Sequence, residues 1–197
     1  MPKSKKSKKN KKSIKLLILH HPLFNKILAL IFIFIGLFIL MGYPPKPIPS
    51  TKNPIKINDN LYKNQTTQDL PVRILLPKEN IDLNVTPSKI INGYWELSEN
   101  TASYGEGSGI PGQNGNTVIF AHAREGLFYN LKDVQVNDVI YVFTKNNWYR
   151  YKVNKITAVY PNQTEVIAPT KNQTLTLYTC TGFSDEKRLI VTAIPQK

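Results

Sequence analysis

The stretch Trp148-Tyr-Arg-Tyr-Lys-Val-Asn-Lys-Ile-Thr-Ala-Val159 decides the fold class of the C-terminal part of this 197-residue chain. Its apolar side chains Tyr149, Tyr151 and Val153 alternate with polar ones, which indicates a strand with one buried and one wet face. Similar runs recur on both sides of it, and we expect further strands over Val72–Leu76, Ile81–Val85, Thr117–His122, Asp138–Lys145, Leu175–Cys180 and Leu189–Ile194. Seven or eight short strands with little helix predict an all-β fold that closes, or nearly closes, into a barrel.

The connections between these strands are predicted to be short. Asn146-Asn147 suits a tight hairpin, because asparagine tolerates positive φ. Helical signals are weak, and we expect only single turns, over Ser88–Ile91, Ser98–Ser103 and Leu127–Leu131. The segment Gly107-Ser-Gly-Ile-Pro-Gly112 fits a dinucleotide-binding pattern by its letters, but it lacks the preceding strand and following helix. We interpret it as a surface loop.

The positive charge of the chain is concentrated at its N-terminus. The formal charge is +13, and nine of the 26 basic side chains lie in residues 1–26, which contain no acid. The rest of the chain therefore carries 17 basic and 13 acidic side chains, a net charge of +4. A nucleic-acid-binding domain needs its basic surface on the folded part, so nucleic acid is not an expected partner. We expect residues 1–15 to be disordered, and we expect the lysine-rich tail, residues 1–26, to lie in the cytoplasm and to bind anionic membrane lipids.

An uncharged apolar run, residues 27–43, follows the tail. As a helix it would be about 25 Å long, the short end of a bilayer span. The preceding lysines predict a single-pass anchor with a cytoplasmic N-terminus and an extracellular C-terminal part. A cleaved signal peptide is the alternative, although no Ala-x-Ala-like site follows. Residues 44–70 are rich in Pro, Asn and Lys and predict a linker, and residues 71–197 then form one domain.

Three residues at predicted strand ends offer thiol chemistry. Cys180 is the one cysteine of the chain, so it is a buried apolar filler, an intermolecular linker or a reactive thiol. His122 is the one histidine of the predicted domain and supplies a group that can exchange protons. If the last two strands pair antiparallel, Arg188 lies beside Cys180, where a guanidinium can favour thiolate and hold an oxyanion. So few Cys and His residues exclude a Cys/His zinc site.

The order of these residues, within the segments TVIFAH, TLYTC and RLIVTA, resembles the sortase family of membrane-anchored bacterial cysteine transpeptidases. The segment TLYTC at 176–180 is the most specific match. The resemblance covers most of residues 71–197, and its further matching segments are Val72–Pro77, Ile81–Val85, Phe128–Leu131 and Asn137–Tyr141. It implies a sortase-like closed β-barrel of seven to eight strands with short helices.

The resemblance also implies a function and a set of site residues. Cys180 would be the nucleophile, His122 the general acid/base and Arg188 the group that holds the oxyanion, with Thr179 and Thr181 beside the substrate. The partners would be exported proteins with a C-terminal LPxTG-like sorting signal and an amine acceptor from a cell-wall precursor or a surface protein. The chain would act at the bacterial cell membrane. This chemistry requires no cofactor and no metal ion.

Departures from the family pattern bear on the subclass. The family often has Gly before the histidine and Arg after it, whereas Ala121 and Ala123 stand here and Arg124 comes one place later. Asn137 replaces a usual Gly, and no Asp-Pro-aromatic lid segment occurs, so the pattern is closest to class D and class E sortases. The alternative from another class is a non-catalytic, membrane-anchored β-barrel binding module with a structural cysteine.

Overall fold

The computed structural model describes residues 22–42, 54–62 and 69–196, and the chain divides into two units, residues 1–48 and 49–197. In the first unit it describes one helix, α1 (Pro22–Gly42), which begins on a proline as first helical turns often do. Within the described part of the chain, no helix meets the combined length and hydropathy that a membrane crossing needs. The predicted tail lies mostly outside the described residues, as do residues 43–53 and 63–68 of the region predicted as anchor end and linker.

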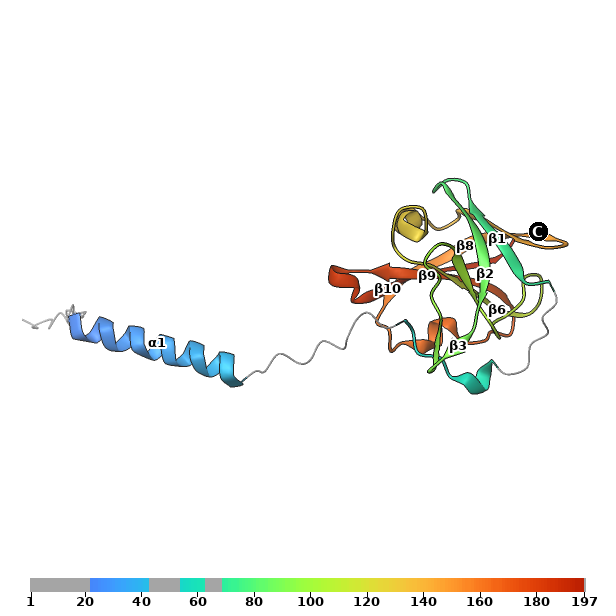
Figure 1. Ribbon diagram of the computed structural model, residues 1–197. Coiled ribbons are helices and arrows are strands. Elements are labelled where there is room, and N and C mark those ends of the chain that lie inside the picture. Colours follow the sequence, from blue (N-terminus) through green and yellow to red (C-terminus); the bar gives the residue numbers. More distant parts are fainter. Residues whose placement is uncertain (1–21, 43–53, 63–68, 197) are drawn as a thin grey trace, which may run out of the picture. The chain divides into compact units, whose positions relative to one another are not determined.

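Eight strands of the second unit close into a barrel, in the order β1-β2-β5-β6-β9-β10-β8-β7 (Figure 1). The all-β fold and the closed barrel are therefore confirmed. The barrel strands are β1 (Pro71–Leu76), β2 (Ile81–Ser88), β5 (Ala102–Gly105), β6 (Gly115–Phe120), β7 (Val139–Thr144), β8 (Trp148–Val159), β9 (Gln173–Thr181) and β10 (Lys187–Pro195). Outside the barrel sheet lie the short pair β3 (Ile90–Ile91) and β4 (Tyr94–Trp95), and the short 3₁₀ helices η1 (Asp59–Leu61), η2 (Phe128–Asp133), η3 (Thr164–Ile167) and η4 (Phe183–Asp185).

Strand β8 behaves as its alternation predicts. Tyr151 and Val153 are fully buried in the barrel core, whereas Arg150 before them and Asn154 after them are exposed. The predicted hairpin turn before β8 is confirmed, because the Thr144 N–H donates to the Asn147 carbonyl over 2.8 Å. The barrel interior is filled mainly by aliphatic side chains from every strand, among them Ile74, Leu76, Val85, Ile119, Ile140, Val142, Leu175, Leu177 and Val191.

Two of the three predicted helical turns are wrong, because pairing with strands distant in the sequence determines the structure there. Residues expected as a helical turn over Ser88–Ile91 instead end β2 and form β3. The turn expected over Ser98–Ser103 gives way to β5 at Ala102, while the turn at Leu127–Leu131 is confirmed as η2. Strand β5 has little strand propensity of its own and is held by parallel pairing with β2 and antiparallel pairing with β6.

A second apolar cluster packs on the outer face of the barrel sheet. Neighbouring residues of a strand face opposite sides, and Leu177 points into the barrel while Tyr178 joins the outer cluster. The ring of Tyr178 stacks on Phe120 at 4.9 Å between centroids, Phe120 stacks on Trp95 at 5.8 Å, and Trp95 meets Tyr62 edge-on at 5.3 Å.

Residues 54–62 complete this outer cluster. Ile55, Ile57 and Tyr62 are buried in it, although the sequence predicted that they belong to a linker over residues 44–70. The prediction is wrong for these three residues because their burial depends on partners far along the chain. The folded unit therefore extends N-terminally beyond residue 71.

Candidate active site

The register between β9 and β10 brings two of the predicted site residues together. The strands are antiparallel, and Cys180 lies directly opposite Arg188. Two residues before Cys180 on β9, Tyr178 lies opposite Ile190, and both belong to the outer cluster. Side chains two residues apart on a strand share a face, so Cys180 and Arg188 are placed on the outer face of the barrel.

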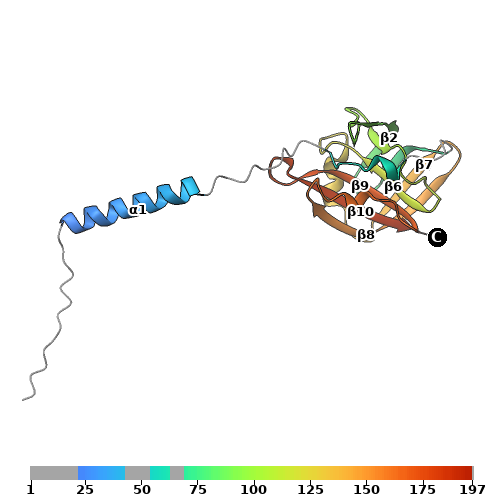
Figure 2. The same cartoon turned by 90° about the horizontal axis from the view of Figure 1, so that it is seen from below.

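The register between β6 and β9 adds His122 from the other side. These strands run parallel, with Phe120 level with Tyr178, and Figure 2 shows β6, β9 and β10 as neighbours. The pairing continues past the end of β6, because the Ala121 N–H donates to the Tyr178 carbonyl over 3.4 Å. Two residues beyond Phe120, His122 is level with Cys180. His122 just past the end of β6, Cys180 on β9 and Arg188 on β10 thus follow one another across neighbouring segments of the sheet.

The surroundings of Cys180 act on its thiol in opposite directions. The side chain is half-buried and forms no disulfide. Burial raises the pKa of the thiol above its ordinary value of 9.0, the positive charge of Arg188 lowers it, and the carboxylate of Asp185 raises it; burial prevails. At neutral pH the free thiol is therefore mostly protonated, and its use as a nucleophile requires a nearby base.

Arg188 is a buried cation, 1% exposed, not a solvated strand-end charge. Its Nη1 group donates to the carbonyls of Asp185 and Lys187, both over 2.8 Å. These contacts fix the guanidinium between β10 and the loop that returns from β9. Arg124, the other arginine near the site, has a half-exposed side chain. Arg188 is thus the pre-positioned cation beside the sulfur.

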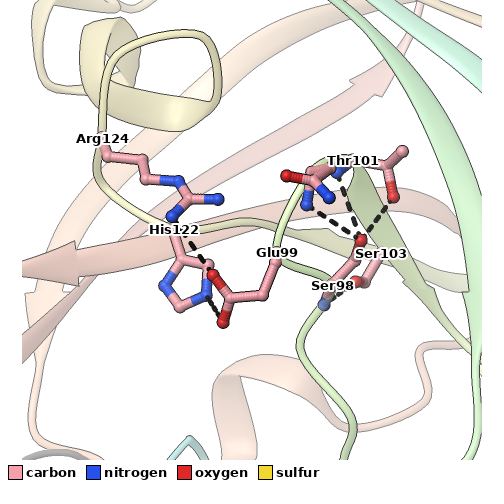
Figure 3. A network of polar contacts seen from close by, with 7 residues as sticks. Ser98, Glu99, Thr101, Ser103, His122 and Arg124 are labelled. Carbon is pink, nitrogen blue, oxygen red and sulfur yellow. Dashed lines mark hydrogen bonds and ion pairs between the residues drawn. The ribbon is translucent and has the colours of Figure 1, made fainter.

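His122 lies next to a carboxylate that the sequence analysis did not identify. Oε1 of Glu99 is 3.3 Å from His122 Nε2, and Oε2 of Glu99 is 3.1 Å from Arg124 Nη1 (Figure 3). The Nε2 atom is shielded from solvent, and its contact with Glu99 falls short of hydrogen-bond geometry. Strands β5 and β6 and the loop between them separate Glu99 from His122, so no local spacing could have linked the two residues.

Comparison with known proteins identifies the family of the chain. Residues 74–196 match the family model of the sortase domain. The chain belongs to the sortase family. It is 27% identical to sortase A of Bacillus anthracis over 128 residues, which are 61% of this chain and 57% of that protein. The chain thus spans little more than half the length of this curated relative.

Solved sortase structures share the fold. Sortase A from Corynebacterium diphtheriae is 29% identical with a TM-score of 0.57, covering 66% of this chain and 62% of that one. The Clostridium perfringens sortase D5 transpeptidase is 25% identical with a TM-score of 0.56, covering 71% of this chain and 86% of that one. The similar structures include sortases of classes A, C and D, so they confirm the family and the barrel.

Two further residues were expected beside the substrate from the sortase resemblance. Thr179 is buried, and its hydroxyl donates to the Ala121 carbonyl over 2.7 Å. This hydrogen bond holds the segment that leads to His122, and the contact of Thr179 with a substrate stays a prediction. Thr181 is half-buried and lies opposite Lys187 at the end of β9, and its contact with substrate stays a prediction.

The described part of this sortase contains no group of three or more His, Cys, Asp or Glu residues that could hold a metal ion. One pair of acids is nevertheless brought together away from the site. Burial first, and then the neighbouring Asp138, raise the pKa of Glu79. Burial also opposes the charged form of Asp138, but hydrogen bonds, the largest from Lys78, outweigh it and lower the pKa of Asp138.

Proposed function

We propose that this chain is a sortase-type cysteine transpeptidase that cleaves a short sorting signal on exported proteins. The observation that carries the proposal is the pairing of Cys180 with Arg188 between β9 and β10, with His122 two residues beyond Phe120, which pairs with Tyr178 of β9. Membership in a family of cysteine transpeptidases supports the same reaction class.

In the proposed mechanism, His122 accepts the thiol proton and the Cys180 sulfur attacks a backbone carbonyl of the sorting signal. The guanidinium of Arg188 stabilises the negative charge that develops on the carbonyl oxygen. The carbon–nitrogen bond then breaks, His122 returns the proton to the departing amine, and a thioester remains. An incoming amine resolves the thioester and transfers its proton to His122, which restores the thiol.

The substrates belong to the proposal as well. They are an LPxTG-like signal near the C-terminus of an exported protein, and an amine of a cell-wall precursor or of another surface protein. The flanks Ala121 and Ala123 of the histidine, and the missing lid segment, support a class D or class E enzyme.

The decisive experiment traps the acyl-enzyme. The chain is incubated with LPxTG-type peptides and examined by mass spectrometry for a thioester on Cys180, which Cys180→Ala must abolish. Arg188→Lys keeps the charge but loses the planar donors, and losing such a donor lowers turnover about 10²–10³-fold. Arg124→Lys is the matched control and should remain within a few-fold of the unchanged protein. If Arg124→Lys is inactive and Arg188→Lys is normal, the oxyanion assignment is wrong.

A structural cysteine in a binding module is the competing function, and the burial that raises the pKa of the thiol is the observation that favours it. Alkylation separates the two. A catalytic Cys180 reacts with iodoacetamide in the native protein and is protected by a bound sorting peptide, whereas a filler reacts only after unfolding.

We also propose that residues 27–43 anchor the enzyme to the membrane with the barrel outside and the lysine-rich tail on anionic lipid. The absence of charge in this run and the nine lysines within residues 1–26 support the proposal. Protease added to intact protoplasts should digest the chain beyond about residue 44 and leave the tail intact. Protection of the whole chain would contradict this topology.

A further inference from the structure

The carboxylate of Glu99 lies between the imidazole of His122 and the guanidinium of Arg124 (Figure 3). Each of its oxygens faces a different partner, at 3.3 Å from His122 Nε2 and 3.1 Å from Arg124 Nη1. The contact with Arg124 holds the carboxylate on one side, so the second oxygen is directed at the imidazole. Arg124 also balances the charge that Glu99 brings to the site.

The backbone that carries Glu99 is fixed by a dense set of hydroxyl contacts. The Ser98 Oγ accepts the N–H groups of Asn100 and Thr101 over 3.3 and 3.2 Å. The Ser98 N–H donates to the Ser103 hydroxyl over 3.1 Å, which ties the turn to β5. Thr101 and Thr86 share a hydroxyl contact of 2.8 Å, which ties it to β2. Glu99 therefore projects from a pinned turn and not from a loose loop.

The solvent exposure of Glu99 and Arg124 argues against a stabilising role for their ion pair. Its side chain is 68% exposed, and that of Arg124 is 49% exposed. Ion pairs this exposed contribute about 0–1 kcal/mol to stability, because water screens them. The His122 Nε2 atom, by contrast, is shielded from water. The consequence of the contact is therefore the orientation of the imidazole and not the stability of the fold.

We infer that Glu99 is a positioning residue for the acid–base chemistry of His122. Its carboxylate accepts a hydrogen bond from the Nε2–H group, which keeps the neutral imidazole in the tautomer that leaves Nδ1 unprotonated. Nδ1 is then the atom that takes the Cys180 thiol proton and returns it to the leaving amine. The two atoms are 3.3 Å apart in the free chain, and catalytic hydrogen bonds often become well aligned only in the substrate complex. This inference rests on the proposed function.

The kinetic test uses the full chain, purified in detergent, with an LPxTG-type peptide. Glu99→Ala should lower kcat about 10–100-fold, the scale of a misplaced acid–base group, while KM changes less than about twofold. Glu99→Gln keeps an acceptor oxygen and should recover most of the lost kcat. Glu125→Ala removes an exposed acid next to Arg124 and should leave kcat unchanged. An unchanged kcat in Glu99→Ala, or an equal loss in Glu125→Ala, overturns the inference.

A second readout is independent of turnover. In the chain labelled with ¹⁵N-histidine, the ring signals assigned by comparison with His122→Gln should report the Nε2–H tautomer. They should move toward a tautomer average in Glu99→Ala and stay in place in Glu125→Ala, with the melting temperature of both variants unchanged. Ring signals that ignore Glu99 overturn the inference. If they respond to Glu99 but the unchanged chain never forms a thioester, the contact stands, and the proposed function and its proton transfer are overturned.

Discussion

Substitution of Tyr62 tests whether residues 54–62 belong to the folded domain. This side chain is 7% exposed, meets Trp95 edge-on at 5.3 Å and donates its hydroxyl to the Ile167 carbonyl over 2.8 Å. Burial raises the pKa of Tyr62 to about 12, so the phenol stays a donor throughout the usual pH range. A linker residue would have none of these properties.

The expected magnitude follows from these contacts. Tyr62→Phe keeps the ring and leaves a buried carbonyl without its donor, a cost of about 1–3 kcal/mol. Tyr62→Ala also removes the ring and opens a cavity beside Trp95, and large aromatic-to-alanine changes in cores cost about 3–5 kcal/mol. The matched control is Leu61→Ala, the neighbouring residue, because Leu61 is 51% exposed and such surface changes stay within about 0.5 kcal/mol.

Urea unfolding of the second unit, residues 49–197, followed by intrinsic fluorescence, measures these differences. The expected order of midpoints is Leu61→Ala close to the unchanged protein, Tyr62→Phe lower and Tyr62→Ala lowest. A Tyr62→Ala variant as stable as Leu61→Ala would show that the segment is a tether, and the placement of the outer cluster would then be wrong.

Three further outcomes are expected. Alkylation of Cys180 should keep accelerating as the pH rises past 9.0, and Asp185→Asn should move this profile to lower pH because it removes a carboxylate that raises the pKa of the thiol; an unmoved profile would contradict that contact. Because the pKa of Glu79 is raised above its ordinary 4.5, the folded state keeps a proton that the unfolded chain loses, so the free energy of unfolding should fall as pH rises through that window; in urea titrations Glu79→Gln should flatten the decline, and a parallel curve would argue against it. Thr179→Val should lower the free energy of unfolding by about 1–3 kcal/mol by leaving the Ala121 carbonyl unpaired, whereas a higher KM at unchanged stability would support the expected substrate contact.

The parts of the fold that could be predicted are those whose signal is local. Strand β8 is predictable from the alternation of apolar and polar residues along its twelve residues. The other barrel strands that are rich in Val, Ile and Leu are predictable from their composition. Strand β5, with the sequence Ala-Ser-Tyr-Gly, has no such signal and exists because β2 and β6 flank it. The prediction of a linker was wrong at Ile55 and Ile57 for the same reason. These two apolar residues lie in a Pro- and Asn-rich stretch and are buried by partners that are distant in the chain.

The residues of the candidate site also differ in whether a local sequence signal could identify them. Cys180 and Arg188 could be placed together because they flank a short connection between two strands that pair antiparallel. His122 was recognised by its residue type and its order in the chain, and the parallel register with β9 supplies its position. Glu99 could not be found this way. Its relation to His122 arises from the pinned turn before β5, and a single glutamate in a loop carries no pattern.

The placement of the site on the outside of the barrel follows from the packing of the inside. The interior is filled by Leu175, Leu177 and their neighbours, so it has no room for a peptide chain. Reactive side chains must therefore leave the sheet on its other face, and the alternation along β9 gives that face to Tyr178 and Cys180. The outer cluster covers the face as far as Tyr178 and supports the strand from outside. Two residues further along β9, Cys180 lies outside the residues of the outer cluster, where it is held by the sheet and is only half-buried, as a positioned nucleophile requires.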